Sequence, residues 1–157
     1  MPHIPSTARG ARFIGWGTSL GHRVVTNDDL TASMDTNDEW IRERTGIHRR
    51  HVGGSTAELS TISGKAALDM AGIDPKSIDA LILATTTPDR TVPATSATVQ
   101  NALGLACGAF DVNAACSGFV YGLVVAHGLI GVGAERIMVI GTDTLSRIVD
   151  WTDRNTA

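Results

Sequence analysis

The stretch that decides the fold is Asp111-Val112-Asn113-Ala114-Ala115-Cys116-Ser117-Gly118-Phe119. It places a lone cysteine at the corner where an apolar strand gives way to a helix of small residues. Because the first N–H groups of a helix point outward and the helix dipole is positive there, a nearby anion is stabilised. Cys116 is therefore predicted to be a nucleophilic thiolate. The alternative is a small buried core residue, the common state of cysteine.

Alternating strands and helices flank this corner on both sides. Residues 79–87 form an apolar, β-branched run typical of a strand buried on both faces. A helix is expected at 94–103, a strand at 109–114, a helix at 117–130 and a strand at 136–142. This βαβαβ series predicts an α/β protein with a mostly parallel sheet. Four glycines weaken the 117–130 helix by roughly 1 kcal/mol each relative to alanine, so close packing in a buried position is expected to offset them.

The preceding residues predict shorter elements. A first strand is expected at 12–18, a capped helical turn from Thr26 or Asn27, and a helix capped by Asn37 and closed by Gly46. An extended segment follows at 47–52. A capping box at residues 55–58 then opens a helix that ends at Gly72. The Gly-x-Gly of residues 15–17 lacks the third glycine and the acidic partner of a dinucleotide fold, so that reading is disfavoured.

Composition narrows the class of protein. The 157 residues are 43% apolar with a net charge of −3, which is typical of a globular domain and offers no broad basic face for nucleic acid. Cys107 and Cys116 lack the spacing of a zinc site or a disulfide framework, so we expect no metal and a reducing compartment. The chain shows neither a secretory leader nor an apolar run long enough to span a membrane. We therefore expect a soluble cytoplasmic protein.

Trp40 shares one short predicted helix with several arginines. An indole offers a stacking face and a guanidinium a bidentate fork, so the group could receive a ligand with an aromatic base and phosphates. The structural alternative is a half-buried tryptophan among solvated arginines.

Four motifs together resemble the β-ketoacyl-acyl-carrier-protein synthase III family of the thiolase superfamily. They lie at residues 38–47, 84–89, 111–119 and 152–154, in the family's order and spacing. The resemblance implies a thiolase-like αβαβα layered fold in which two similar halves pack around a pair of buried helices. Residues 1–157 are then the amino-terminal half, ending before its last strand, and the helix after Cys116 is one of the buried pair.

The resemblance also implies a reaction and partners. Cys116 attacks the thioester of a short acyl-CoA, coenzyme A leaves, and malonyl-acyl-carrier protein condenses with loss of carbon dioxide. The backbone N–H of Cys116 donates to the thioester oxyanion. No cofactor is bound permanently, because the coenzyme A thioester is a substrate. The complete enzyme is expected to be a homodimer.

Further site residues follow from the same resemblance, position by position. Trp40 and Arg154 match the pair that sandwiches the adenine of coenzyme A, and Arg44 and Thr45 match its nucleotide and phosphate contacts. Leu145 matches a residue of the acyl channel. Val92 matches a residue that closes the partner protomer's pocket. Some relatives carry phenylalanine at this position, so the small side chain of Val92 does not indicate which acyl primer is used.

The family's catalytic histidine and asparagine come from its second half and are absent from these residues. The chain alone is therefore expected to lack condensing activity. Two alternatives stay open: a secondary-metabolite ketosynthase that loads another acyl group, and a non-catalytic piece that binds acyl-CoA or carrier protein. For docking of an acidic carrier protein, the chain offers Arg42, Arg49 and Arg50.

Overall fold

The computed structural model describes residues 9–156, so the two ends of the expected domain at 1–157 lie outside the described residues. Contacts divide the chain into two compact units. Residues 9–19 and Thr56–Asp143 form the first, which we call the sheet unit. Leu20–Ser55 and residues 144–156 form the second, which we call the hairpin unit.

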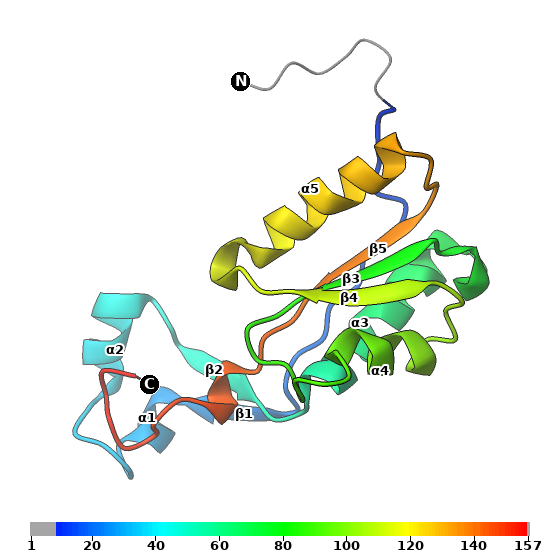
Figure 1. The fold of residues 1–157 in the computed structure, drawn as a ribbon. Coiled ribbons are helices and arrows are strands. Elements are labelled where there is room, and N and C mark those ends of the chain that lie inside the picture. The colour runs from blue at the N-terminus through cyan, green and yellow to red at the C-terminus, as the bar shows by residue number, and fades with distance from the viewer. Residues whose placement is uncertain (1–8, 157) are drawn as a thin grey trace. The chain divides into compact units, whose positions relative to one another are not determined.

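A three-stranded parallel sheet lies at the centre of the sheet unit. Its strands are β3 (Ala80–Ala84), β4 (Gly108–Val112) and β5 (Ile137–Gly141), in the order β4-β3-β5 (Figure 1). In the register, Leu83 of β3 lies opposite Asp111 of β4 and Ile140 of β5. The predicted parallel series is confirmed, and the strands begin and end within a few residues of the predicted limits.

Helices cover both faces of this sheet. Figure 1 shows α5 (Gly118–Gly131) on one side, and α3 (Thr56–Ala71) and α4 (Thr95–Ala102) on the other. Leu81, Ile82 and Leu83 of β3 are completely buried because the strand is covered on both sides. Leu81 and Leu83 join the core formed with α3 and α4, whereas Ile82 lies near Gly122 of α5.

The glycines of α5 were expected to allow close packing, and they do so only in the first half of the helix. A Cβ on Gly118 would lie 3.2 Å from the Cβ of Ala84, and one on Gly122 would lie 2.9 Å from Cγ1 of Val139. The helix backbone therefore approaches the sheet closely at these two positions. The expectation was wrong for Gly128 and Gly131, where an added Cβ would meet nothing within 4 Å among the described residues.

This difference predicts opposite effects for the same substitution. Gly122→Ala presses a methyl group against the stiff side chain of Val139, so overpacking is expected to outweigh the gain in helix propensity and lower the free energy of unfolding by about 1–2 kcal/mol. Gly128→Ala is the matched control and should raise it by up to about 1 kcal/mol. Chemical denaturation of this chain measures both; a stabilising Gly122→Ala would contradict the close approach.

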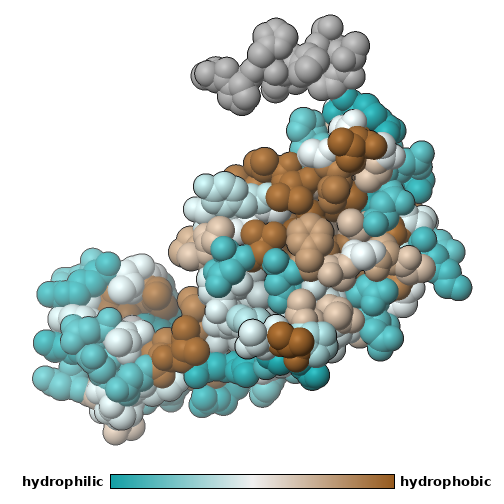
Figure 2. Space-filling model, viewed as in Figure 1, coloured by the Kyte–Doolittle hydropathy of each residue, from teal (hydrophilic) through white to brown (hydrophobic). Residues whose placement is uncertain are grey.

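Among residues 9–156, the side of α5 away from the sheet carries exposed apolar side chains. Figure 2 shows apolar side chains gathered over this helix. The exposed large residues along it are Phe119, Val120, Tyr121, Val124 and Val125. A continuous apolar helix face of this kind is typical of a surface that packs against another protein body.

The hairpin unit is built on two antiparallel strands, β1 (Arg23–Thr26) and β2 (Arg49–Val52). Between them lie α1 (Asn27–Leu30) and α2 (Asp38–Thr45), while the later segment adds the 3-10 turn Leu145–Arg147. The predicted caps are confirmed: Thr26 forms a capping box, Asn37 caps α2, and Gly46 ends it with φ 71°. Its core consists of Val25, Leu30, Met34, Ile41 and Val52, with Trp40 and Trp151 packed against it.

The predicted strand at 12–18 was wrong. These residues form no strand and lie instead along α3. A Cβ on Gly15 would clash with the carbonyl oxygen of Ala67, and a Cβ on Gly17 would clash with the carbonyl oxygen of Ser63. The two glycines therefore bring this segment against the helix backbone, a contact that the apolar pattern alone does not distinguish from strand pairing.

Candidate active site

Cys116 lies in a short turn between β4 and α5 of the sheet unit. A 3-10 turn, Ala115–Ser117, separates the strand from the helix, and the Cys116 side chain is exposed. Ala115 has φ 46°, a left-handed conformation that alanine rarely adopts. The predicted corner is confirmed, and in this chain Cys116 is not a buried core residue.

The turn also changes the set of donors at the helix start. The N–H of Ser117 donates to the carbonyl of Ala114 at 3.1 Å, and the N–H of Gly118 donates to the carbonyl of Ala115. The expectation that the N–H groups there are unpaired was therefore wrong for these two. The dipole of the long helix α5 still directs its positive end toward the cysteine.

Close contacts hold the start of α5 against the carboxyl ends of the strands. Gly118 lies on Ala84 at the end of β3, and the ring of Phe119 lies against Gly141 at the end of β5. The N–H of Thr85 donates to the carbonyl of Val112 at 3.0 Å, which extends the pairing of β3 and β4 up to the turn. The position of Cys116 is thus set by the sheet itself.

Two carboxylates of the sheet unit cap helices from a distance. Asp111 of β4 accepts hydrogen bonds from the first two backbone N–H groups of α4, at 3.0 and 2.9 Å. The residue that precedes α4, Ala94, has no side chain for this purpose. The carboxylate of Asp89 likewise accepts hydrogen bonds from the first two backbone N–H groups of α3, at 3.1 and 2.7 Å. Asp111 therefore ties the strand that leads to Cys116 to a neighbouring helix.

A third carboxylate, Asp143, joins the ends of β3 and β5. Its Oδ1 accepts four hydrogen bonds: from the backbone N–H of Thr86 at 2.7 Å, and from the hydroxyls of Thr86, Thr85 and Thr87 at 2.9, 3.2 and 3.3 Å. Burial alone raises the pKa of Asp143, but these hydrogen bonds outweigh it and hold the pKa below its ordinary value.

Asp143 is therefore expected to make stability depend on acid pH. A carboxylate whose pKa is depressed in the folded state contributes stability above its unfolded pKa, about 3.9, and this is lost as the pH falls through the folded value. Asp143→Asn should lower the free energy of unfolding at pH 7 by roughly 1–2 kcal/mol and flatten its decline below about pH 4. Denaturant titrations at pH values from about 2 to about 7, which span the unfolded pKa of the carboxyl group, measure both effects.

The matched control is Asp69→Asn, because Asp69 forms an exposed ion pair with Lys65 at 3.0 Å. Such pairs contribute about 0–1 kcal/mol. If Asp143→Asn lost stability in acid as steeply as the wild type, the cluster of threonine hydrogen bonds would not be the acid-sensitive element.

The hairpin unit brings together three of the predicted coenzyme residues. Trp40 is half-buried, as its structural alternative predicted, but two guanidinium groups also lie over its ring. Cζ of Arg44 is 4.5 Å and Cζ of Arg154 is 4.9 Å from the ring centroid. Nη1 of Arg154 also donates to the carbonyl of Asp35 at 3.2 Å. An indole with two stacked cations is a platform for a planar, negatively charged ligand.

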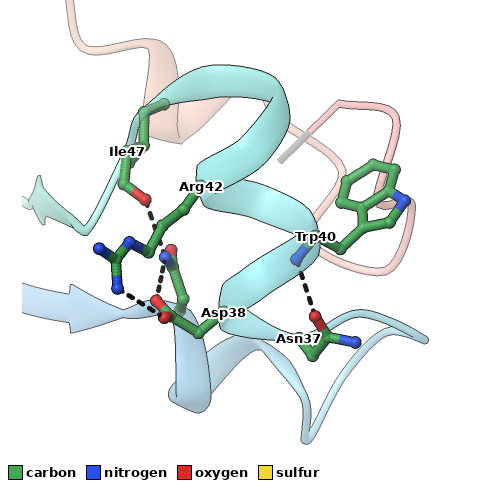
Figure 3. Close-up of polar contacts among 6 residues, drawn as sticks. Asn37, Asp38, Trp40, Arg42 and Ile47 are labelled. Atoms are coloured by element: carbon green, nitrogen blue, oxygen red, sulfur yellow. Dashed lines mark hydrogen bonds and ion pairs between the residues drawn. The ribbon is translucent and has the colours of Figure 1, made fainter.

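The start of α2 fixes the Trp40 backbone. Oδ1 of Asn37 accepts the N–H of Trp40 at 2.8 Å, and Asp38 pairs with Arg42 at 3.2 Å (Figure 3). Asp38 also accepts a hydrogen bond from the side chain of Asn27, which lowers the pKa of this carboxyl together with the contribution of Arg42. Thr45, at the end of α2, donates its hydroxyl to the carbonyl of Ile41 at 2.7 Å.

The two predicted acyl-pocket residues belong to different units. Val92 lies in the sheet unit and is 83% exposed; Leu145 lies in the hairpin unit and is 53% exposed. Their predicted roles stay predictions. Within residues 9–156, the acidic, cysteine and histidine side chains form no group of three that could hold a metal ion. Over the same range, every helix is too short or too polar to cross a membrane.

The sequence did not predict the hydrogen bonds that Asn27, Asp89, Asp111 and Asp143 make to distant elements. Their partners come from other elements, so local spacing carries little signal for them. Three of them nevertheless lay in quoted segments: Asn27 was one of the two residues at which the capped turn was predicted to begin, Asp89 closes the motif at 84–89, and Asp111 opens the motif at 111–119.

Comparison with known proteins agrees with this geometry. The family model of 3-oxoacyl-[acyl-carrier-protein (ACP)] synthase III matches residues 110–157. A β-ketoacyl-[acyl-carrier-protein] synthase III from Erythrobacter litoralis is 52% identical over 151 residues, or 93% of this chain and 47% of the relative. The crystal structure of the Aquifex aeolicus synthase III superposes with a TM-score of 0.91 and 43% identity, over 94% of this chain and 49% of that one.

A further structure comes from polyketide synthesis. The priming β-ketosynthase of the R1128 pathway superposes with a TM-score of 0.89 and 30% identity, over 98% of this chain and 47% of that one. Together these likenesses give the class: the chain has the fold of about half of a thiolase-like ketosynthase. Within that class it is similar to β-ketoacyl-[acyl-carrier-protein] synthase III, and it spans about half the length of the curated relatives it matches.

Proposed function

We propose that the complete protein is an acyltransferase that condenses an acyl-CoA primer with malonyl-acyl-carrier protein through an acyl group on Cys116. The observation that carries this proposal is the exposed thiol at the turn into α5, the position that the resemblance gives to the acyl-accepting cysteine. The similarity to β-ketoacyl-[acyl-carrier-protein] synthases III supports the reaction class.

In the first stage, the thiolate of Cys116 attacks the carbonyl carbon of the acyl-CoA thioester. The carbonyl electrons move onto oxygen, and the backbone N–H of Cys116 stabilises that oxyanion. When the carbonyl re-forms, the bond to the coenzyme sulfur breaks. Coenzyme A leaves as a thiolate that takes up a proton, and the acyl group stays on Sγ.

In the second stage, malonyl-acyl-carrier protein loses carbon dioxide. The electron pair of the broken C–C bond forms an enolate, whose carbon attacks the acyl-cysteine carbonyl. The bond to Sγ then breaks, which releases the β-ketoacyl product and restores the thiolate. The histidine and asparagine that stabilise the enolate are proposed to come from the family's second half.

The coenzyme is proposed to bind at the platform of the hairpin unit. Trp40 and Arg154 take the adenine between them, for which Arg154, now 4.9 Å from the ring centroid, moves away from the indole; Arg44 and Thr45 contact the nucleotide and its phosphates. The support is the stacking of both guanidinium groups over the indole. Leu145 is proposed to line the acyl channel, and Val92 to close the pocket of the partner in a homodimer.

The uncovered apolar side of α5 supports the layered arrangement. We propose that in the complete protein this face packs against the second half and makes α5 one of the two central helices. A cytoplasmic location is part of the same proposal.

The direct test supplies the full-length protein with acetyl-CoA and malonyl-acyl-carrier protein. The expected result is one carbon dioxide released for each β-ketoacyl-carrier protein formed. Release of coenzyme A without a condensed product would contradict the condensing role.

The likeness to a polyketide priming ketosynthase favours one second candidate, an enzyme that loads a different acyl group for secondary metabolism. A panel of straight, branched and aromatic acyl-CoA primers separates the two. Preference for acetyl-CoA favours fatty acid initiation, and preference for a larger primer favours the second candidate. A non-catalytic acyl-CoA-binding protein would bind the panel without forming an adduct.

A further inference from the structure

Asn27 is a buried polar hub of the hairpin unit. It is 1% exposed, and its side chain makes three hydrogen bonds. Nδ2 donates to Oδ1 of Asp38 and to the carbonyl of Ile47, both at 2.8 Å, and Oδ1 accepts from Nη1 of Arg50 at 2.9 Å. Both amide hydrogens and the amide oxygen are therefore used.

These three bonds fasten both ends of α2. Asp38 is the first residue of the helix, and Ile47 directly follows the glycine that ends it. Arg50 belongs to β2 and lies opposite Val25 of β1. One side chain on α1 therefore links the start of α2, its end and the hairpin; the contacts of Asp38 and Ile47 are drawn in Figure 3.

Helix α2 depends on such contacts because it has only eight residues. Isolated helices of this length are not stable in water, so the pose of α2 is set by packing. Ile41, which is 3% exposed, provides the apolar anchor. Asn27 provides the polar one.

Trp40 is two residues beyond Asp38, so it points to a different side of the helix. Asn27 therefore holds α2 from the side away from the stacking platform. Since Trp40, Arg44 and Thr45 all lie on α2, a change in the pose of this helix moves the three residues together and shifts the indole relative to Arg154.

Only an amide suits this site. Asp38 and Ile47 each need a donor, whereas Arg50 needs an acceptor. Burial lowers the pKa of Arg50, and its Nη2 has no hydrogen-bond partner in the described part of the chain. Loss of Asn27 would therefore leave this half-buried guanidinium poorly satisfied.

We propose that Asn27 is a positioning residue of the coenzyme site, which orients the Trp40 platform through α2 without touching the ligand. The inference rests on the proposed function, since it requires that coenzyme A bind at Trp40.

The test measures the affinity of the full-length protein for coenzyme A by calorimetry. Asn27→Asp removes both donors and sets a second carboxylate against Asp38, so the affinity should fall roughly 3- to 30-fold. Asp38→Asn alone keeps an acceptor for Asn27 and should change affinity less than about threefold. The double variant Asn27→Asp/Asp38→Asn restores one donor and one acceptor between the two positions and should recover most of the loss.

A control separates positioning from general destabilisation. Val99→Ala makes a cavity in the sheet unit, where Val99 is fully buried, and should lower the melting temperature without changing affinity measured well below it. If Asn27→Asp does not fold, the double variant decides: affinity near that of the wild type supports the proposal, and weak binding overturns it.

Two outcomes distinguish a failure of the positioning role from a failure of the proposed coenzyme site. If Trp40→Ala weakens binding while Asn27→Asp binds like the wild type, the positioning role is overturned and the coenzyme site stands. If Trp40→Ala has no effect on coenzyme A, the coenzyme site falls, and the inference falls with it.

Discussion

Replacing Trp40 by alanine is expected to weaken coenzyme A binding by roughly 1–3 kcal/mol, the usual contribution of a base stacked on an aromatic side chain. This corresponds to a rise in Kd of roughly 5- to 150-fold. The expectation follows from the two guanidinium groups over the indole, which mark its ring as a stacking surface within the hairpin unit. Isothermal titration with coenzyme A and with adenosine diphosphate gives the values.

Because Trp40 also packs against the hairpin core, truncation alone does not distinguish stacking from packing. Trp40→Phe keeps a smaller aromatic face and should restore most of the affinity. Trp151→Phe is the matched control, since Trp151 packs on the same core and the change removes part of this packing together with the hydrogen bond to the carbonyl of Ser146. Unchanged affinity in Trp40→Ala would favour the purely structural role of the indole.

Replacing Cys116 by serine is expected to abolish acyl transfer from acetyl-CoA in the full-length protein. A thiolate is a far better nucleophile than an un-ionised hydroxyl, so the serine oxygen should attack the thioester too slowly to support turnover. The measurement is release of coenzyme A, followed with a thiol reagent after removal of the protein.

Cys107 provides the matched control for this prediction. It is half-buried, and burial raises the pKa of its thiol, which disfavours the reactive thiolate. Cys107→Ser should therefore keep nearly full activity. Equal losses in the two variants would indicate that the thiols act through stability rather than through chemistry.

The sheet unit was largely predictable because its signals are local. The run at 79–87 is nearly unbroken in its apolar and β-branched residues, and this pattern belongs to a central strand covered on both faces. Gly46 and Asn37 marked the ends of α2 for an equally local reason, since caps act within one turn. The prediction failed where a contact replaced the local pattern, as at 12–18, where Gly15 and Gly17 lie against α3 rather than beside a strand.

Strand β1 was missed because it has only four residues and one buried side chain, Val25. Its pairing with β2 joins segments separated by two helices, which no short window contains. The caps supplied by Asp89 and Asp111 were missed for the same reason. A carboxylate that caps a helix from another strand leaves no mark next to that helix.

The candidate site likewise contains residues that the sequence indicated and residues that only the structure reveals. Cys116 was indicated by its place between a strand and a helix, which the structure confirms as an exposed turn. The pairing of Trp40 with Arg154 came from the resemblance, because the two residues lie far apart in the sequence. Asn27 became visible only through burial, since its three partners converge when α1, α2 and β2 pack together.

The account depends most on the claim that Cys116 carries the acyl group. Brief incubation of the full-length protein with acetyl-CoA, followed by digestion and mass spectrometry, tests it most directly. We expect one acetyl group on the peptide that contains Cys116 and none on that peptide in Cys116→Ser. An acetyl group on Cys107 instead, or a protein that binds acetyl-CoA yet carries no adduct, would contradict the account.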